Sequence, residues 1–390
     1  MTSPAPSRLL IANIGSTSFK YRLFDMSGPR VLAHGRVERI GQQGGACPDY
    51  ETALTACLAD LIGEGKPLAS VAELAAIGFK AVHAGPIGGV RRIDDQVLAA
   101  MEEFSFFAPA HNPPYIAAMR AFGKAMPQVP LVALFETAFF DQLEESAVTY
   151  AVPYRWKEAD GIRRYGFHGA SHRAASDRAR ELCGRGDIRH ISCHLGGSSS
   201  VAAVRNGVAV DTSFGISPQS GLPQNNRVGD FDVFAALYIM RKHGLSVDQM
   251  ARVLATESGL AGIAGGTGDL RDLTAGAEAG DARSQLALDV FVRAVRRYIG
   301  AFLVELGGLD VLTFSGGIGE NGDGVRAAVC QGLEAFGIVL DAERNRAVRG
   351  EGTISAEGSA VRILVLPADE EIVVARAVAE FLGYSLSRPE

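Results

Sequence analysis

The chain has 390 residues, of which 47% are hydrophobic and 21% charged, ordinary values for a globular protein with room for two or three domains. Its net charge of −6 comes without any basic run, which argues against nucleic-acid binding because that needs concentrated lysine and arginine. Five cysteines without C-x-x-C spacing argue against a disulfide framework or a zinc site. The start "MTSPAPSRLL" lacks the features of a signal peptide, and no window approaches the roughly 20 apolar residues of a membrane-spanning helix, so we expect a cytoplasmic protein.

The first third of the chain alternates strands with helices. Alternating apolar residues predict several short strands over residues 9–39, and residues 51–66 predict a helix that stops at Gly63 and Gly65. The next segments predict a buried strand, a helix, a proline-rich loop entering a second helix, and an apolar strand: "AAIGFKAVHAG", "DDQVLAAMEEFSFF", "APAHNPPYIAAMRAF" and "VPLVALF". The last of these strands ends on an acid, Glu136.

The pattern restarts after about residue 140. Residues 187–213 predict a strand, a Gly/Ser turn and a second strand, and residues 230–300 predict mostly helix, interrupted by a glycine loop at 259–273. Residues 309–337 predict a strand, a glycine loop and a helix, and residues 361–383 predict a strand, an acidic loop and a final helix.

Two predicted hairpins share one plan. "IANIGSTSFKYRLF" and "ISCHLGGSSSVAAV" each place a polar residue, a glycine and small hydroxylic residues between two apolar strands, about half a chain apart. Such turns suit hairpins, and they also let backbone N–H groups approach a phosphate. The spacing leaves two interpretations open: two unrelated hairpins, or a duplicated domain that offers two phosphate-binding turns.

Several residues are suited to phosphoryl chemistry. None of the four glycine-rich segments is a P-loop or a Rossmann fingerprint, which argues against both classes. Glu136 and Glu370 directly follow predicted strands, where carboxylates can hold Mg²⁺ beside substrate phosphates, whereas we expect the adjacent Glu371 to cap a helix. Cationic groups from separate loops, His168 and Arg227 among them, can stabilise charge on a transferring phosphoryl group. We expect four other histidines, His34, His172, His190 and His243, to be structural.

The ordered motifs "NIGSTSFKYRLFD", "APAHNPP", "FETAF", "GIRRYGFHGASH", "CHLGGSSSVAAVRNGVAVDTS", "GGIGEN" and "PADEEIVVAR" resemble those of the acetate kinase family, from Leu9 to about Ala377. The resemblance implies an α/β fold of duplicated ribonuclease H-like domains, of the actin and hexokinase type of the acetate and sugar kinase superfamily, with a cleft between them. It implies a first domain of residues 1–139 plus 372–390 and a second of 140–371 that carries most of the nucleotide site. It also implies a homodimer that uses ATP with Mg²⁺ (or Mn²⁺) to phosphorylate a short carboxylic acid reversibly, giving an acyl phosphate and ADP.

The same resemblance implies a role for individual residues. Asn13 and Glu370 match magnesium positions, and Glu136, His168 and Arg227 match catalytic positions. The expected ATP-binding residues are Lys20, His194, Leu195, Gly196, Gly197, Ser198, Asp269, Leu270, Arg271, Gly317, Ile318, Gly319, Glu320 and Asn321. The expected acceptor site consists of Lys80, which would hold the carboxylate, with Val82, Ala110, Phe167 and Pro218 around the apolar end.

The departures from the family pattern fall on this site. Lys80 stands where the family usually has arginine, Glu136 where it has aspartate, Gly197 where it has an amide side chain, and Ala110 where it has leucine; the loop "GLPQNNR" around Arg227 also differs. The changes at Lys80 and Glu136 could compensate each other in an active enzyme, and Ala110 favours propionate or butyrate over acetate. The alternatives are a kinase with another acceptor or phosphoryl donor, and a catalytically silent nucleotide-binding paralogue.

Overall fold

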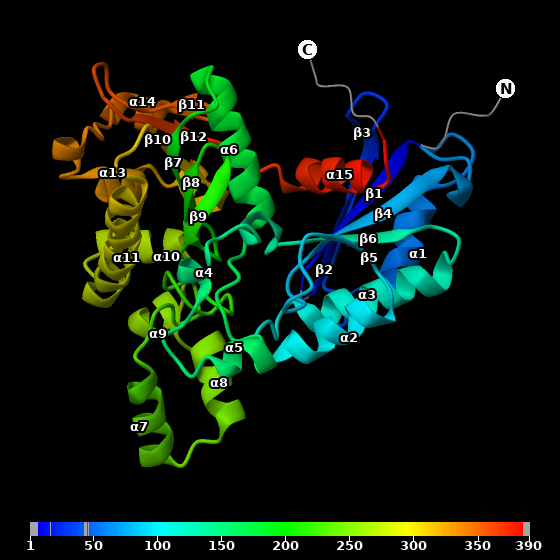
Figure 1. The fold of residues 1–390 in the computed structure, drawn as a ribbon, viewed down its shortest axis with the longest axis horizontal. Coiled ribbons are helices and arrows are strands. Elements are labelled where there is room, and N and C mark those ends of the chain that lie inside the picture. Colours follow the sequence, from blue (N-terminus) through cyan, green and yellow to red (C-terminus); the bar gives the residue numbers. More distant parts are fainter. Residues whose placement is uncertain (1–6, 16, 43–44, 46, 385–390) are drawn as a thin grey trace. The chain divides into compact units, whose positions relative to one another are not determined.

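The computed structural model describes residues 7–15, 17–42, 45 and 47–384, and the chain forms two compact units (Figure 1). Unit 1 comprises Met1–Asp141 together with Asp369–Glu390, and unit 2 comprises Gln142–Ala368. Ser16, in the first predicted hairpin turn, lies outside the described residues. Among the described residues, no helix is both long and apolar enough to cross a membrane.

Unit 1 is built on a six-stranded sheet in the order β3-β2-β1-β4-β6-β5. Its strands are β1 (Arg8–Ile14), β2 (Ser18–Asp25), β3 (Arg30–Glu38), β4 (Leu74–Ala81), β5 (Val90–Arg92) and β6 (Leu131–Phe135). Strands β1, β2 and β3 form an antiparallel meander, β4 runs parallel to β1, β6 runs parallel to β4, and β5 is antiparallel to β6.

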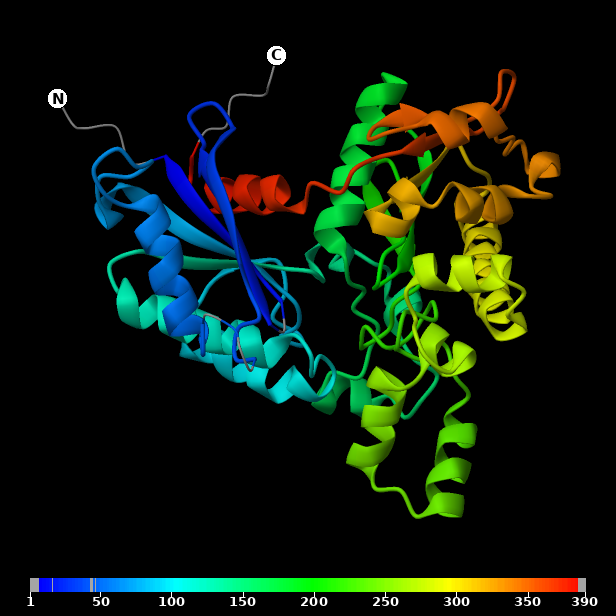
Figure 2. The same cartoon turned by 180° about the vertical axis from the view of Figure 1, so that it is seen from behind.

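Helices cover both faces of this sheet, as Figures 1 and 2 show from opposite sides. They are α1 (Tyr50–Leu61), α2 (Asp95–Glu103), α3 (Asn112–Ala125) and α15 (Glu370–Phe381), with short 3-10 helices η1 (Val71–Glu73), η2 (Phe104–Phe106) and η3 (Ala138–Phe140). On one face, Val374 and Val378 of α15 pack against β1 and β4, and a Cβ in place of Gly78 would lie 2.7 Å from Ile11 Cδ1 of β1 and 3.1 Å from Val378 Cγ2. On the other face, Phe79 of β4 packs edge-on against Phe122 of α3. The alternation of side chains along the strands therefore gives the sheet two buried faces.

Unit 2 repeats the same sheet. Its strands are β7 (Arg189–His194), β8 (Ser200–Arg205), β9 (Val208–Thr212), β10 (Val311–Ser315), β11 (Gly352–Thr353) and β12 (Arg362–Val365), in the order β11-β12-β10-β7-β8-β9. Strands β7, β8 and β9 form the meander, β10 is parallel to β7, β12 is parallel to β10, and β11 is antiparallel to β12. Strand for strand this is the pairing of unit 1, so the duplication, one of the two readings of the hairpins, is confirmed.

The helices of unit 2 also lie on both faces of its sheet. They are α4 (Glu145–Val148), α5 (Arg155–Asp160), α6 (Gly169–Cys183), α7 (Val233–His243), α8 (Val247–Thr256), α9 (Gly259–Ala264), α10 (Leu270–Glu278), α11 (Ala282–Leu306), α12 (Gly316–Asn321), α13 (Asp323–Cys330), η4 (Glu334–Phe336) and α14 (Ala342–Ala347). The buried stripe of α11, which includes Phe291 and Val295, packs over β7 and β8. Helix α6 packs against β7 and β10 through Ala175 and Ala179.

Two predicted loops are helical in part. The segment 259–273 contains α9 and the beginning of α10, and the predicted glycine loop after β10 is the short helix α12. The strand-to-helix turn needs glycine at Gly316, whose φ is +75° and where a Cβ would lie 2.6 Å from the Leu195 carbonyl oxygen. A glycine-rich sequence thus marks a close approach of backbones here rather than the absence of a helix. Helix α1 ends at Leu61, before the glycines that were expected to stop it.

Candidate active site

A buried cluster of charges lies at one edge of the unit 1 sheet. Lys80 is near the end of β4, Glu136 follows β6, and Glu370 begins α15; because β4 and β6 are parallel, their carboxyl ends meet at this edge. The Lys80 Nζ atom lies 2.6 Å from Glu370 Oε2 and 3.4 Å from Glu136 Oε1. The three side chains are largely buried, with exposed fractions of 16% for Lys80, 14% for Glu370 and 5% for Glu136.

The cluster is electrostatically unbalanced. Burial by itself would lower the pKa of Lys80, but the negative charges of Glu136 and then Glu370 outweigh it and hold that pKa well above its ordinary value. Lys80 therefore stays charged at neutral pH. One ammonium faces two carboxyl groups, so when both are ionised the cluster carries a net negative charge that favours a further cation.

Asn13 and Lys20 are partners across the first hairpin. They face each other in the β1–β2 register, where Lys20 is exposed. The Tyr115 hydroxyl of α3 donates to the Asn13 Oδ1 atom over 3.4 Å and accepts from the Ile14 N–H over 3.1 Å. Burial raises the pKa of Tyr115, against the opposing effect of the Lys80 charge, so the phenol keeps its proton. The Asn13 amide is thereby held beside the strand end.

The oxygen donors of this edge suit a magnesium ion. Asn13 offers an amide oxygen and Glu370 a carboxylate, and Mg²⁺ prefers such oxygens together with substrate phosphates and water. Among the described residues, no three His, Cys, Asp or Glu side chains are arranged to hold a metal ion by themselves. Of the other residues predicted for the acceptor site in unit 1, Val82 is buried two positions after Lys80, and Ala110 is exposed in the turn before α3.

Unit 2 gathers three histidines through serine hydroxyls. His168 stands at the start of α6 with φ +59°, and its Nδ1 atom lies 2.8 Å from Ser200 Oγ. The same hydroxyl is 2.8 Å from Nε2 of His172, which is fully buried. The His194 ring lies 4.4 Å, centroid to centroid, from that of His168, and its Nδ1 atom is 2.7 Å from Ser171 Oγ. Burial, with the His194 charge, lowers the pKa of His172 well below its ordinary value, so this ring stays neutral and supports the network around His168.

The Pro218 carbonyl anchors the loop that carries Arg227. It accepts hydrogen bonds from Arg227 Nη1 over 3.1 Å and from Gln224 Nε2 over 2.6 Å. Burial lowers the pKa of Arg227 to about 10, which leaves the guanidinium charged at neutral pH. Phe167, the other residue of unit 2 that was predicted for the acceptor site, is buried edge-on against Phe214.

A cavity of about 920 Å³ lies in unit 2 and holds many of the expected nucleotide-binding residues. Those on its wall are Gly196, Gly197, Asp269, Leu270, Arg271, Gly317, Ile318 and Asn321. The others are not on it: Leu195 is buried behind the wall, His194 lies in the histidine network, Ser198, Gly319 and Glu320 are outside the lining, and Lys20 belongs to unit 1. The volume is within the range of small-molecule sites.

Hydrogen bonds within the wall shape this cavity. The Leu195 carbonyl accepts from the N–H groups of Ile318 and Gly319 over 2.9 and 3.0 Å, which ties the β7–β8 turn to α12. Asp269 caps α10 and pairs with Arg271 over 2.6 Å, and these hydrogen bonds from Arg271 lower the pKa of Asp269 to about 2.

Sequence reasoning missed part of the wall. The additional lining residues are Asn225, Thr274, Glu278, Gln285, Leu288, Asp289, Val292, Gly322, Asp323, Gly324, Val325 and Ala328. Four of them lie on α11 at helical spacing: Gln285, Leu288, Asp289 and Val292. This spacing predicts that they share one face of the helix, but it does not predict that the face lines a cavity. Asn225 lies in the loop "GLPQNNR", which was recognised as different from the family pattern, but only Arg227 of that loop was predicted to be functional.

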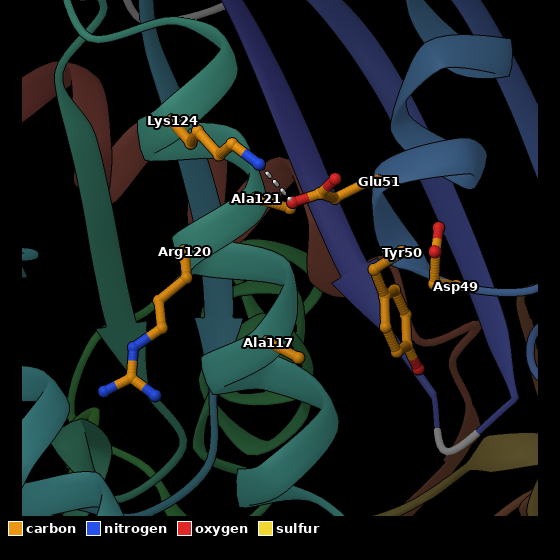
Figure 3. Close-up of a pocket in the computed structure, with 7 residues that line it drawn as sticks. All are labelled: Asp49, Tyr50, Glu51, Ala117, Arg120, Ala121 and Lys124. Atoms are coloured by element: carbon orange, nitrogen blue, oxygen red, sulfur yellow. Dashed lines mark hydrogen bonds and ion pairs between the residues drawn. The ribbon is translucent and has the colours of Figure 1, made fainter.

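A second cavity, of about 340 Å³, lies in unit 1 between the start of α1 and α3 (Figure 3). Its wall includes Tyr50, whose hydroxyl donates to the Gly15 carbonyl over 2.6 Å, and the Lys124–Glu51 ion pair at 3.0 Å. None of the predicted site residues lines it.

Comparison with known proteins gives consistent matches over the whole chain. A sequence model of the acetokinase family matches residues 8–376. An acetate kinase of Bacillus cytotoxicus is 41% identical, covering 95% of this chain and 98% of that protein. The crystal structure of Porphyromonas gingivalis acetate kinase superposes with a TM-score of 0.86 at 36% identity, covering 96% of this chain and 100% of that one. A propionate kinase from Francisella tularensis gives a TM-score of 0.86 at 29% identity, covering 95% of this chain and 98% of that one. These likenesses confirm the expected duplicated α/β fold, and the family match over residues 8–376, with 41% identity to an acetate kinase over 95% of the chain, shows that this chain belongs to the acetokinase family.

Proposed function

We propose that this chain is an ATP-dependent carboxylate kinase. It transfers the γ-phosphoryl group of ATP reversibly to a carboxylate oxygen of acetate or a slightly larger short-chain acid, giving an acyl phosphate and ADP. The observation that carries this proposal is the full-length similarity to proteins named acetate kinase, at 41% identity over 95% of the chain. The buried Lys80 cluster and the cavity in unit 2 support it, because they supply an acceptor-binding cation and a space for the nucleotide.

Lys80 binds the acceptor in this proposal. A carboxylate is already ionised at neutral pH, so it attacks phosphorus without a general base, and the protein must align it and neutralise charge. Substrate binding would give the Lys80 ammonium a third carboxylate beside Glu136 and Glu370, and a cation held at Glu370 would offset the negative charge of the cluster. Val82, Ala110, Phe167 and Pro218 would contact the apolar end of the acid.

The other predicted residues act on the nucleotide. The cavity of unit 2 takes ATP along Gly196, Gly197 and the remaining predicted residues of its wall, with Lys20 as a further phosphate contact. His168 and Arg227 stabilise the equatorial oxygens of the transferring phosphoryl group, and the Glu136 carboxylate would help to hold the metal ion. Asn13 and Glu370 would hold Mg²⁺ (or Mn²⁺), which supplies positive charge to the phosphates when bound.

We also propose that units 1 and 2 correspond to the two predicted domains and that the chain works in the cytoplasm. The five cysteines are all free thiols, as in a reducing compartment. The reduced state of these thiols supports a cytoplasmic location and has no part in the proposed reaction.

A homodimer is the assembly we propose. No residue of α7 is buried, and Phe234, Leu237 and Tyr238 on it are 75%, 53% and 61% exposed. Apolar side chains gathered in this way mark interaction surfaces, and α7 offers the same patch to a second copy.

Acyl phosphate formation tests the proposed activity. The purified chain, ATP and Mg²⁺ are incubated with straight-chain acids of one to six carbons, and acyl phosphate is trapped as the hydroxamate. Product with acetate is expected. A preference for propionate or butyrate would identify the larger-acid alternative, which the exposed Ala110 favours. No product with any acid, despite measurable ATP binding, would contradict the proposal and indicate a silent paralogue.

A further inference from the structure

The turn at Gly197 and the loop at Asn225 meet on the wall of the nucleotide cavity. Gly197 lies between β7 and β8, and Asn225 lies in the loop before Arg227. A Cβ added to Gly197 would stand 3.5 Å from Asn225 Nδ2. The Asn225 amide therefore occupies the space beside a residue that has no side chain of its own.

The backbone of Asn225 is fixed by three other segments. Its N–H donates to the Gly197 carbonyl over 3.3 Å, and its carbonyl accepts from the Ala261 N–H over 2.8 Å. At Gly268 a Cβ would lie 2.0 Å from the Asn225 carbonyl oxygen, so only glycine allows this approach. The amide thus leaves the backbone from a defined position rather than from a free loop.

The polar side chains of this loop have different partners. Gln224 and Arg227 both donate to the Pro218 carbonyl. Asn225 instead lines the cavity, and no described residue forms a hydrogen bond with its side chain. An amide that lines a ligand cavity in this way is a donor with two N–H groups available to a ligand.

We propose that the Asn225 side-chain amide donates a hydrogen bond to the phosphate chain of the bound nucleotide. Gly196, Gly197 and Gly317 form the neighbouring wall, where missing side chains let phosphate oxygens approach the backbone. The apolar part of the cavity, with Leu288 and Val292 of α11, suits the base instead. This inference rests on the proposed function, because it assumes that the cavity binds a nucleoside phosphate.

Calorimetric titration of the full chain with ADP and with adenosine tests the contact. Asn225→Ala is expected to weaken ADP binding about tenfold, as for loss of one hydrogen bond to a charged group, and to leave adenosine affinity unchanged. Asn225→Asp keeps the size of the side chain and is expected to weaken ADP binding further by repulsion. Asn226→Ala is the matched control, since Asn226 is the exposed neighbour outside the cavity. Unchanged ADP affinity in Asn225→Ala, or an equal loss of ADP and adenosine affinity, overturns the proposal.

Moving the amide provides an independent test. The φ of Gly197 is not in the left-handed region, so the position accepts a side chain. Asn225→Gly alone is expected to behave like Asn225→Ala, and Gly197→Asn combined with Asn225→Gly is expected to recover ADP affinity to within about threefold of wild type. Failure to recover in a double variant that binds adenosine normally contradicts the proposal.

The same samples separate this proposal from the proposed function. If the wild type binds ADP but forms no acyl phosphate, the proposed kinase activity is overturned. The Asn225 contact is then still tested by the ADP and adenosine affinities of its variants. If the wild type binds ADP no more tightly than adenosine, the proposed contact between Asn225 and the phosphate chain is overturned directly.

Discussion

The side-chain lengths of Lys80 and Glu136 together set the distance between their charged groups. Lysine ends in a point charge on a flexible stem, whereas arginine would present a broad planar fork at the same place. The longer glutamate brings its carboxylate to 3.4 Å from Lys80 Nζ, while Glu370 approaches the same ammonium to 2.6 Å. Shortening one side chain or enlarging the other alone therefore disturbs all three charges.

Two substitutions should be coupled for this reason. Lys80→Arg and Glu136→Asp are each expected to lower kcat/KM for the acid about tenfold, and the double variant is expected to come within about twofold of the wild type, a coupling of more than about 2 kcal/mol. Steady-state kinetics of the four proteins measure the cycle. Strictly additive losses would show that the two residues do not compensate.

Ala110 carries a prediction about substrate choice. The residue is exposed in the turn before α3, and leucine there would add about three carbons of wall. Ala110→Leu is expected to shift the ratio of kcat/KM for butyrate over acetate towards acetate, by several-fold for each methylene of the acid. The ratio is measured with propionate and butyrate against acetate. A wild type that uses acetate at least as well as both larger acids would contradict this role for Ala110.

Residues next to apolar strands were the most predictable. Glu136 and Glu370 could be selected from sequence because a buried run ends and an acid follows, and parallel strands then bring such residues to one edge. Asn225 could not, since its position beside Gly197 depends on a contact between loops about 28 residues apart that no local pattern encodes. The pairing of Lys80 with Glu370 across 290 residues is likewise a product of the fold.

At the scale of elements, the sheets were more predictable than the helices around them. Most strands of the two meanders follow from their apolar residues, as in the continuous apolar run of β1 and the alternating pattern of β2, whereas β8 and β9 were predicted as a single strand. Helices α9 and α12 were missed because glycine normally disfavours helix, yet here glycine allows backbones to meet. Helix α6 was not assigned, since its buried face is formed by alanine, serine and histidine rather than by large apolar residues.

Gly266 and Gly268, both shortly before α10, differ in the atoms around them, so their alanine variants can be compared as test and control. A Cβ at Gly268 would lie 2.0 Å from the Asn225 carbonyl oxygen, whereas a Cβ at Gly266 would meet nothing within 4 Å. Gly268→Ala is therefore expected to displace the Asn225 loop and weaken ATP binding by at least about tenfold, and Gly266→Ala is expected to leave it unchanged. Equal affinities for the two variants would contradict this packing.

The pairing of β7 with β10 predicts a pH dependence of stability. His190 of β7 is fully buried with its Nε2 atom 2.8 Å from Thr313 Oγ1 of β10, and burial lowers its pKa to about 3. The unfolded chain binds a proton at this histidine near pH 6.5. Between these values the unfolded state holds more protons, so the free energy of unfolding falls as the pH falls, by up to about 1.4 kcal/mol per pH unit.

Urea unfolding from pH 4 to pH 7 measures this slope. His190→Gln keeps a polar side chain beside Thr313 but cannot titrate, so its slope is expected to be smaller than that of the wild type by about one proton. His172 adds a slope of the same sign in both proteins, since burial is the largest cause of its lowered pKa. Parallel curves for wild type and His190→Gln would contradict the assignment.

At the scale of the whole molecule, the surface of α7 predicts self-association. The wild type is expected to elute with twice the mass of one chain in size-exclusion chromatography with light scattering. Phe234→Glu combined with Leu237→Glu is expected to give one chain mass, because two charges would be buried in the apolar interface. Phe336→Glu is the control, since Phe336 is 60% exposed and lies outside α7. A wild type with the mass of one chain would contradict the proposal.

The discontinuity of unit 1 has a consequence for synthesis on the ribosome. The chain leaves unit 1 after Asp141 and returns only at Asp369, so all of unit 2 is made before α15 can cover β1 and β4. Until then Lys80 and Glu136 have emerged without Glu370, and the apolar face that α15 covers has no helix on it. Nascent and prematurely ended chains therefore lack the complete Lys80–Glu136–Glu370 cluster even where the cavity of unit 2 has formed, so the proposed activity is expected only from chains that include α15.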